Sequence, residues 1–341
     1  MIREAIAAVV SGKSLKMAEA AAVMREIMEG EATPSQLGAL LTALRIKGET
    51  PGEIAGMAQV MREKSLKVNV AGPLLDTCGT GGDGKNTFNV STAAAFVAAG
   101  AGLKVAKHGN RAASGSCGSA DVLEALGVKI DLPPEGVQRC IEEVGVGFMF
   151  APVFHPAMRH AAPVRRELGI PTVFNVLGPL TNPAGAQSQL LGVANGLLGE
   201  KMAEVLKLLG IHHALVVHGE DGLDELTLSG KTSGWEVLDG VIHSWILPVD
   251  QTGLSRATVE DIKGGTKEDN AATMRRVFQG EKGPVRDVVL LNSGAALVVG
   301  DRADTVRQGV EMAGEVVDSG EALRKLDALI ELSQKLGHEG G

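Results

Sequence analysis

The stretch LLDTCGTGGDGKNTFNVSTAAAFVAA, residues 74–99, decides the fold of this chain and contains its first candidate site. The apolar pair Leu74-Leu75 leads into a loop with four glycines among residues 79–84, and a helix is expected over Ser91–Ala99. A strand, a glycine loop and a helix start can aim several backbone N–H groups at one anion, because glycine has no Cβ to block the approach. The loop matches neither a Walker loop nor a GxGxxG fingerprint. The stretch therefore predicts a phosphate-binding loop or a structural turn in which Ser91 caps the helix.

Polar side chains around the same loop favour the first alternative. They could supply hydroxyl and amide groups to a phosphate, and they are Thr80, Thr87, Asn89, Ser91 and Thr92.

Composition excludes several classes of protein. The 341 residues carry a formal charge of −8, which disfavours a nucleic-acid partner and requires that an anionic ligand be compensated locally. The three cysteines, Cys78, Cys117 and Cys140, show no CxxC or metal-ligand spacing, so free thiols in the cytoplasm are expected. The sequence has no apolar run of 18 residues, so no membrane span is expected. Its N-terminus has no uninterrupted apolar signal core of about 7–15 residues, so secretion is not expected.

The order of the sequence patterns predicts two parts. Thr33-Pro34 with Gln36 and Thr50-Pro51 with Glu53 match helix starts, so the first seventy residues should be helical. After Asn69, short apolar runs alternate with glycine loops and amphipathic stretches, which is typical of a largely parallel α/β sheet. Strands are expected at Leu74-Leu75, Lys104–Ala106, Val146–Phe150, Ala214–Val217 and Val288–Leu291. Helices are expected at Ser91–Ala99, Gly118–Leu126, Pro134–Val144, Leu198–Leu209 and Asp301–Asp318.

A second candidate loop follows the strand expected at 104–106. Its cations Lys107 and Arg111 could each meet a phosphate, and Asn110 could orient a second ligand. The position at the carboxyl end of a strand is where open parallel sheets bind ligands. A solvated loop with a surface ion pair is the alternative, and His108 alone is better explained as a structural residue.

A third candidate lies after the strand expected at 214–217. Residues 220–225 include four carboxylates, those of Glu220, Asp221, Asp224 and Glu225. Oxygen ligands without cysteine suit a hard cation such as Mg²⁺, which typically binds one or two carboxylates together with substrate phosphates. An acidic surface turn is the alternative.

A fourth candidate is the basic stretch 155–166, which leads into FNVLGPLTNP at 174–183. Its cations could bind a carboxylate or form one solvated helix face, and the Gly-Pro and Asn-Pro pairs could be turns only. Spacing does not decide whether Arg165 or Arg166 points inward.

Taken together, several long motifs in order resemble the anthranilate phosphoribosyltransferase family of tryptophan biosynthesis. They are GTGGD, NVST, KHGNRAAS, GSADVLEALG, HPAMRHAAPVRRELG and FNVLGPLTNPA, with LLTALRIKGETPGEI near the start. The resemblance implies an α/β fold shared with pyrimidine nucleoside phosphorylases, with a mostly parallel central sheet flanked by helices. It also implies a small all-α domain over residues 1–70, with a returning segment around 159–182, and a larger α/β domain over 71–341. A homodimer through the helical domain is the implied assembly.

The implied reaction transfers a 5-phosphoribosyl group from 5-phosphoribosyl 1-diphosphate (PRPP) to the amine of anthranilate, using Mg²⁺, with two ions expected. The family's PRPP site falls on Gly79, Gly82, Asp83, Thr87, Asn89, Val90, Ser91, Thr92, Lys107, His108, Gly109, Asn110, Arg111, Ala112, Ala113, Ser114, Gly115 and Ser119. Its anthranilate contacts fall on Gly79, His108, Asn110 and Arg165, and its metal ligands on Ser91, Asp224 and Glu225. Ser116 departs from the family at an often basic position.

Two other functions fit the same fold. A pyrimidine nucleoside phosphorylase would use inorganic phosphate and a nucleoside, but the acidic pair Asp224-Glu225 suits it poorly and its KxSTGGVGDK-type loop is missing. A noncatalytic nucleic-acid-binding relative would need a broad basic surface, which the charge of −8 argues against.

Overall fold

A computed structural model describes residues 1–112 and 117–339 of the chain. Within these residues the strands form one seven-stranded sheet in the order β3-β2-β1-β4-β5-β6-β7. Neighbours from β3 to β5 are parallel, whereas β6 and β7 pair antiparallel at one edge. The strands are β1 (Leu75–Gly79), β2 (Val105–Gly109), β3 (Val146–Phe150), β4 (Ser188–Gly192), β5 (His213–Gly219), β6 (Lys231–Leu238) and β7 (Val241–Pro248).

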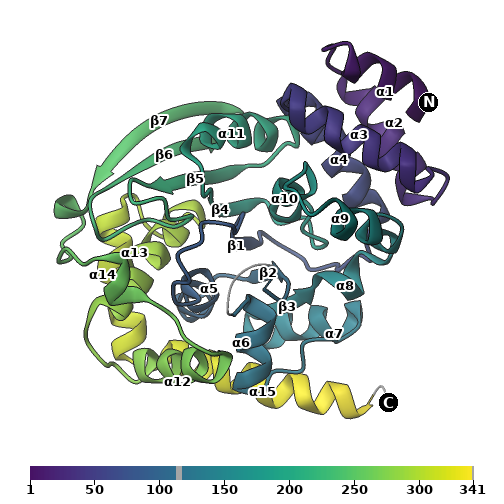
Figure 1. The fold of residues 1–341 in the computed structure, drawn as a ribbon. Coiled ribbons are helices and arrows are strands. Elements are labelled where there is room, and N and C mark those ends of the chain that lie inside the picture. Colours follow the sequence, from purple (N-terminus) through teal and green to yellow (C-terminus); the bar gives the residue numbers. More distant parts are fainter. Residues whose placement is uncertain (113–116, 340–341) are drawn as a thin grey trace.

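Helices cover both faces of the sheet and form the N-terminal part of the chain (Figure 1). They are α1 (Ile2–Val10), α2 (Met17–Met28), α3 (Pro34–Lys47), α4 (Pro51–Lys64), α5 (Val90–Gly100), α6 (Ser119–Leu126), α7 (Pro134–Arg139), α8 (Ala151–Phe154), α9 (Ala162–Leu168), α10 (Phe174–Leu177), α11 (Gly199–Leu208), α12 (Lys267–Phe278), α13 (Pro284–Val299), α14 (Val306–Asp318) and α15 (Glu321–Glu339). The expected fold class, a small helical part with a larger, mostly parallel α/β part, is confirmed.

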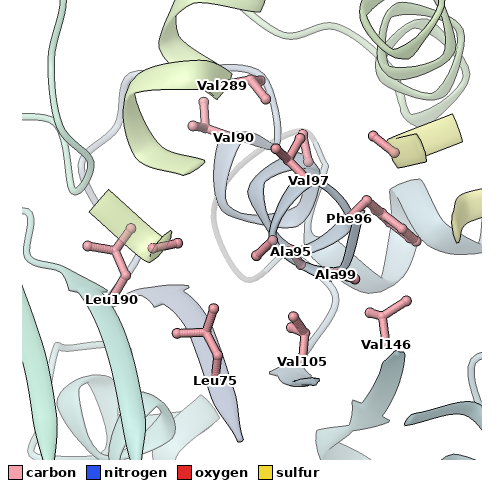
Figure 2. Close-up of a cluster of buried hydrophobic side chains, with 14 of the residues drawn as sticks. Leu75, Val90, Ala95, Phe96, Val97, Ala99, Val105, Val146, Leu190 and Val289 are labelled. Atoms are coloured by element: carbon pink, nitrogen blue, oxygen red, sulfur yellow. The ribbon is translucent and has the colours of Figure 1, made fainter. Parts of the chain in front are cut away.

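Alternation along the strands divides the core into two clusters. Leu190 and Leu215 belong to the cluster that contains α5 and α13, whereas their neighbours Leu191 and Val216 belong to the cluster that contains α11. Successive side chains of a strand point to opposite faces, so β4 and β5 each supply both clusters. In Figure 2, side chains of the strands, among them Leu75 and Leu190, point toward α5, whose apolar side chains fill the space above the sheet.

The second cluster also contains the core of α1–α4. Both expected helix starts are confirmed: Thr33 and Gln36 form a capping box at α3, and Thr50 and Glu53 form one at α4. Helices α9 and α10 lie beside α3 and α4, although more than a hundred residues separate them in sequence (Figure 1). The helical part therefore shares apolar side chains with α9, α10 and α11.

The strand expected at Val288–Leu291 is wrong, because these residues lie in the middle of α13. Pro284 occupies the first turn of this helix, and 12 of its 16 residues are buried, with α5 and α14 packed against it. A helix buried on all sides shows no amphipathic period, so a short apolar run within it is indistinguishable from a buried strand.

Other boundaries also differ from those expected. Strand β2 extends to Gly109, so Lys107 and His108 are strand residues and do not belong to a loop. The helix expected from Asp301 begins at Val306, and Thr305 caps it. Strands β4, β6 and β7 were not expected; β4 begins with Ser188 and Gln189, which are polar yet buried.

No helix in the described part of the chain is both long and apolar enough to cross a membrane.

Candidate functional site

The glycine loop and the acidic pair meet at one edge of the sheet. The Gly81 N–H donates to Asp224 Oδ2 at 2.7 Å, and the Ser91 N–H donates to Glu225 Oε1 at 3.2 Å. Strands β1 and β5 run parallel with only β4 between them, so the loops that follow them emerge at the same edge. The fold therefore brings together two sequence features that are 143 residues apart at the Gly81–Asp224 contact.

Two glycines make room for Asp224. A Cβ on Gly79, the last residue of β1, would overlap the Asp224 carboxylate. A Cβ on Gly192, the last residue of β4, would overlap the Asp224 backbone carbonyl. Side chains at either position would force the acidic segment away from the loop.

The loop itself adopts a backbone that favours glycine. Gly81, Gly82 and Gly84 have φ angles of 68°, 81° and 69°. At Gly81 and Gly82 an added Cβ would meet open space, so their φ angles and not crowding require glycine. The Phe88 N–H donates to the Ile262 carbonyl at 2.9 Å, which braces the end of the loop.

The acidic turn divides into a structural half and a half that faces the loop. The Asp221 carboxylate accepts hydrogen bonds from Thr227 Oγ1 at 2.5 Å and from Ser229 Oγ at 2.6 Å, so it holds its own turn together. Glu220 is exposed. Asp224 and Glu225 alone of these four carboxylates contact the glycine loop or the start of α5.

Asp224 and Glu225 are partly buried, close to one another and to Asp83. Desolvation and the nearby Asp83 carboxylate raise the pKa of Asp224 to about 6. Desolvation and Asp224 raise the pKa of Glu225 well above its usual value. Acidic groups that are packed together in this way favour the approach of a cation.

Lys107 supplies a buried positive charge beside this site. Its Nζ donates to the Thr77 carbonyl at 2.5 Å and to Ser91 Oγ at 3.4 Å. Burial lowers the pKa of Lys107, which the Asp76 carboxylate partly offsets. The ammonium therefore lies between β1 and the first turn of α5.

The start of α5 differs from the sequence prediction. Asn89 occupies the N-cap position and Ser91 is the second helical residue, so the expected Ser91 cap is wrong. Ser91 uses its backbone N–H, one of the donors that a helix start leaves unpaired, to bind Glu225. Val90 and Thr92 are almost fully buried, so neither side chain is exposed to a ligand. Val90 points into the core in Figure 2.

Asn89 links three segments through its side-chain amide. Its Oδ1 accepts a hydrogen bond from Asn270 Nδ2 at 2.9 Å, and its Nδ2 donates to the Cys117 carbonyl at 3.0 Å. Asn270 is buried at the start of α12 and accepts the Gly265 N–H at 2.8 Å. No sequence pattern marked Asn270 as a site residue, because it is one polar residue in a polar helix start.

In the second loop, the contacts of Arg111 and Asn110 are with residues other than the acidic pair. Arg111 forms ion pairs with Asp121 at 3.0 Å and Glu124 at 2.9 Å. In this structure Arg111 therefore agrees with the alternative prediction, a solvated loop with a surface ion pair. Asn110 is exposed and its carbonyl accepts the Ser119 hydroxyl at 3.3 Å. Four residues of the loop, Ala113, Ser114, Gly115 and Ser116, lie outside the described residues.

The structure distinguishes the two neighbouring arginines of the basic stretch by their burial. Arg165 is partly buried and its guanidinium lies 5.0 Å from the centre of the Phe174 ring, whereas Arg166 is exposed. Burial lowers the pKa of Arg165. An arginine stacked on an aromatic ring keeps its planar donors in a fixed orientation.

Residues 178–183, which join the helical part to β4, are held from both sides. The Arg62 Nε of α4 donates to the Leu180 carbonyl at 2.6 Å. The Asn182 Nδ2 donates to Asp76 Oδ2 of β1 at 2.8 Å. Asp76 and Asn182 are almost fully buried, and sequence reasoning missed both because nothing in the spacing paired them.

His108 and His155 form a buried neutral pair beside residues 178–183, with ring centres 5.0 Å apart. Burial lowers the pKa of His108 to about 3 and that of His155 to about 4. The backbone at Gly178 partly offsets the lowering of the His108 pKa, and the backbone at Thr181 partly offsets that of His155. Both rings are therefore neutral near pH 7.

This pair should make the protein less stable in mild acid. An unfolded histidine binds a proton below about pH 6.5, so stability that is present above that pH is lost as the pH falls toward 4. The expected loss between pH 7 and 5 is about 1–2 kcal/mol per histidine. Urea unfolding at both pH values should show a smaller loss for His155→Gln, whereas the exposed His243→Gln should match the wild type. If His155→Gln lost as much stability between pH 7 and 5 as the wild type, His155 would not be the buried neutral histidine described here.

Comparison with known proteins agrees with this geometry. The model of the glycosyl transferase family, helical bundle domain, matches residues 3–65, and that of its a/b domain matches residues 71–323. An anthranilate phosphoribosyltransferase from Dehalococcoides mccartyi is 59% identical over 338 residues, covering 98% of this chain and 99% of that protein.

Solved structures of anthranilate phosphoribosyltransferases are also similar to this chain in fold and sequence. The anthranilate phosphoribosyltransferase from Thermus thermophilus has a TM-score of 0.92 at 51% identity, covering 97% of this chain and 99% of that one. The Saccharomyces cerevisiae enzyme, solved in complex with PRPP and Mg, has a TM-score of 0.91 at 29% identity, with 98% of each chain covered. The yeast enzyme has also been solved with 4-fluoroanthranilate. The chain therefore belongs to the anthranilate phosphoribosyltransferase family.

Proposed function

We infer that this protein transfers the 5-phosphoribosyl group of PRPP to the amine of anthranilate, giving N-(5-phosphoribosyl)anthranilate and pyrophosphate. The observation that carries this inference is the contact between the glycine loop and the Asp224-Glu225 segment, with the start of α5 beside it. Backbone donors for an anion and carboxylates for a cation are thus adjacent, which is the combination that a magnesium diphosphate requires.

The glycine loop and the first turn of α5 are proposed to hold the diphosphate and ribosyl phosphate of PRPP. Gly81 and Gly82 bring backbone to the surface without side chains, which supports a role in anion binding. The residues on which the family's PRPP site falls are proposed to bind PRPP in this protein. Among them, Val90 and Thr92 would act through their backbone groups. Arg111 would have to leave Asp121 and Glu124 in order to contact a phosphate.

Ser91, Asp224 and Glu225 are proposed to hold Mg²⁺, as two ions. The fit rests on the closeness of Asp83, Asp224 and Glu225. Burial, together with the like charges of these carboxylates, raises the pKa of Asp224 and of Glu225. Among the described residues no three His, Cys, Asp or Glu side chains are already arranged as a metal site. Two carboxylates completed by substrate phosphates are a usual magnesium environment. Bound there, Mg²⁺ would offset the charge that grows on the departing diphosphate.

The chain's own residues are proposed to promote a direct displacement at the anomeric carbon, through a transition state with oxocarbenium character. The backbone N–H groups of the loop would stabilise the leaving diphosphate. Burial raises the pKa of Cys78 well above its usual value, so this thiol stays protonated and is a poor nucleophile. The neutral His108 would line the path of the aromatic substrate without adding charge.

Arg165 is proposed to pair with the anthranilate carboxylate. Replacing Arg165 by alanine should raise the KM for anthranilate about tenfold to a hundredfold, because a hydrogen bond to a charged group is lost. The KM for PRPP should change little. The exposed Arg166→Ala is the matched control and should behave as the wild type. An unchanged anthranilate KM in Arg165→Ala would rule out this role.

Assembly as a homodimer through the helical part is a further component of the proposal. Val10, at the end of α1, is 70% exposed, and Ile46, in the last turn of α3, is 82% exposed. Helices α1 and α3 contact one another, so a second copy that packs on these helices could cover exposed apolar side chains. Sedimentation velocity should show a dimer for the wild type and a monomer for Ile46→Asp. A monomeric wild type would exclude this assembly.

The domain division and the location in the cell are also proposed. A helical domain of residues 1–70 with a returning segment around 159–182, and an α/β domain of residues 71–341, are supported by the two matched family domains. The cysteines Cys78, Cys117 and Cys140 are free, which supports a location in the reducing cytoplasm.

Product analysis tests the proposed reaction. The protein is mixed with PRPP, Mg²⁺ and anthranilate, and pyrophosphate and the anthranilate adduct are quantified. One pyrophosphate should be released for each adduct formed. Release of a free base from a pyrimidine nucleoside in the presence of phosphate, without adduct formation in the first mixture, would instead identify a nucleoside phosphorylase.

A further inference from the structure

The two carboxylates of the acidic pair lie in a segment without regular structure. Strand β5 ends at Gly219 and β6 begins at Lys231, so Asp224 and Glu225 are not part of a strand ladder. Buried backbone groups in such a segment need partners from elsewhere, because an unpaired buried amide is costly. The direction in which both carboxylates point depends on what holds this backbone.

A single buried amide holds the residue after the pair. Asn292 Oδ1 accepts the Leu226 N–H at 2.9 Å, and Asn292 Nδ2 donates to the Leu226 carbonyl at 3.1 Å. Asn292 Nδ2 also donates to the Val288 carbonyl of its own helix at 3.0 Å. The Asn292 side chain is fully buried. It therefore contacts both backbone groups of Leu226, as a neighbouring strand would.

The other end of the segment is held by the sheet. The Gly219 N–H donates to the Leu223 carbonyl at 3.0 Å. Asp224 and Glu225 are therefore the two residues between a sheet anchor at Leu223 and an amide anchor at Leu226. Two fixed points this close together leave the pair little freedom to turn away from the glycine loop.

The helix that carries Asn292 is connected to the rest of the site. Helix α13 packs on α5 and on strands β1, β4 and β5. In Figure 2, Val289 of α13 lies next to Val90, the first residue of α5. One rigid helix therefore supports both the start of α5, where Ser91 meets Glu225, and the segment that carries Glu225.

We propose that Asn292 is a positioning residue that aims the Asp224 and Glu225 carboxylates at the metal of the substrate complex. This inference rests on the proposed function, because it assigns to Asn292 the orientation of the proposed Mg²⁺ ligands. Asn292 touches neither metal nor substrate and acts only through the backbone of Leu226. Partners that orient metal ligands typically account for about 10–100-fold in metal affinity.

The test measures binding as well as activity. Titration calorimetry of PRPP into the full-length protein at several Mg²⁺ concentrations gives the Mg²⁺ needed for half-maximal PRPP binding. Asn292→Ala should raise this concentration about tenfold or more. The KM for anthranilate should stay within about twofold, because Arg165 lies outside the Asn292 contacts.

Ser293→Ala is the matched control. Ser293 is the next residue of α13, is equally buried, and has a hydroxyl with no hydrogen-bond partner among the described residues. Its Mg²⁺ requirement should equal that of the wild type. Asn292→Asp keeps the acceptor for the Leu226 N–H and loses the donor to the Leu226 carbonyl, so an intermediate increase is expected.

Thermal unfolding of each variant separates positioning from stability. If Asn292→Ala does not fold, Asn292→Asp carries the test with the smaller expected effect. A Mg²⁺ requirement in a folded Asn292 variant equal to that of Ser293→Ala would overturn the inference. If PRPP binding to the wild type did not depend on Mg²⁺, the proposed metal site would be overturned, and the positioning role of Asn292 with it.

Discussion

Replacing both Asp224 and Glu225 by alanine is expected to lower kcat/KM by about a thousandfold or more, with the Mg²⁺ dependence of turnover lost. Asp224 accepts the Gly81 N–H, and Glu225 accepts the Ser91 N–H. Removing both carboxylates leaves the glycine loop without its acidic partner. Steady-state rates at increasing Mg²⁺ concentrations measure the effect.

A control from the same turn distinguishes a metal site from an acidic surface. Glu220 is exposed and contacts neither the loop nor α5 through a hydrogen bond found among the described residues. Glu220→Ala removes one carboxylate from the turn and should keep the wild-type rate and Mg²⁺ dependence. Full activity of the double variant would show that the acidic pair does not hold the metal.

Gly192→Ala is expected to have the second largest effect, although Gly192 belongs to none of the proposed binding sets. The added Cβ would overlap the Asp224 backbone carbonyl, so the acidic segment or β4 has to move. Overpacking of this kind costs about 1–3 kcal/mol of stability. A displacement of the proposed metal ligands by about 1 Å should reduce kcat about a hundredfold.

Gly52→Ala is the matched control for this substitution. Gly52 lies in the first turn of α4, and a Cβ there would meet open space. This variant should keep wild-type activity and gain up to about 1 kcal/mol, because alanine favours a helix over glycine. Urea unfolding and steady-state kinetics check both variants. Wild-type kinetics in a stably folded Gly192→Ala would show that the close approach of Asp224 to β4 is unimportant.

Sequence patterns identified those parts of the site that depend on residues close together in the chain. The glycine loop, the acidic pair and the capping boxes at Thr33 and Thr50 each lie within about ten residues. The sequence predicted a largely parallel sheet with ligands beyond the carboxyl ends of its strands. The contact between Gly81 and Asp224 also depends on the observed order β1-β4-β5, which includes a strand that was not predicted.

Residues that act through distant partners were not predictable in this way. Asp76 meets Asn182, and Asn292 meets Leu226, across 106 and 66 residues. A lone buried amide or carboxylate has no period or spacing that marks it. The same limit applied to Arg165 and Arg166, because the deciding contact is the Phe174 ring.

Val288–Leu291 shows a different limit. The same four apolar residues fit a central strand or the middle of a buried helix, and the proline at 284 and the length of the segment were the available signals for a helix. Because Asn292 follows directly, the wrong assignment also concealed the residue that holds Leu226.

The fluorescence of anthranilate reports directly on the proposed phosphoribosyl transfer. The protein is mixed with anthranilate, PRPP and Mg²⁺, and the fluorescence is followed over time. The signal should fall only when PRPP and Mg²⁺ are both present, and a chelator of Mg²⁺ should stop the decrease. A constant signal in the complete mixture, together with phosphorolysis of a pyrimidine nucleoside by the same preparation, would contradict the account.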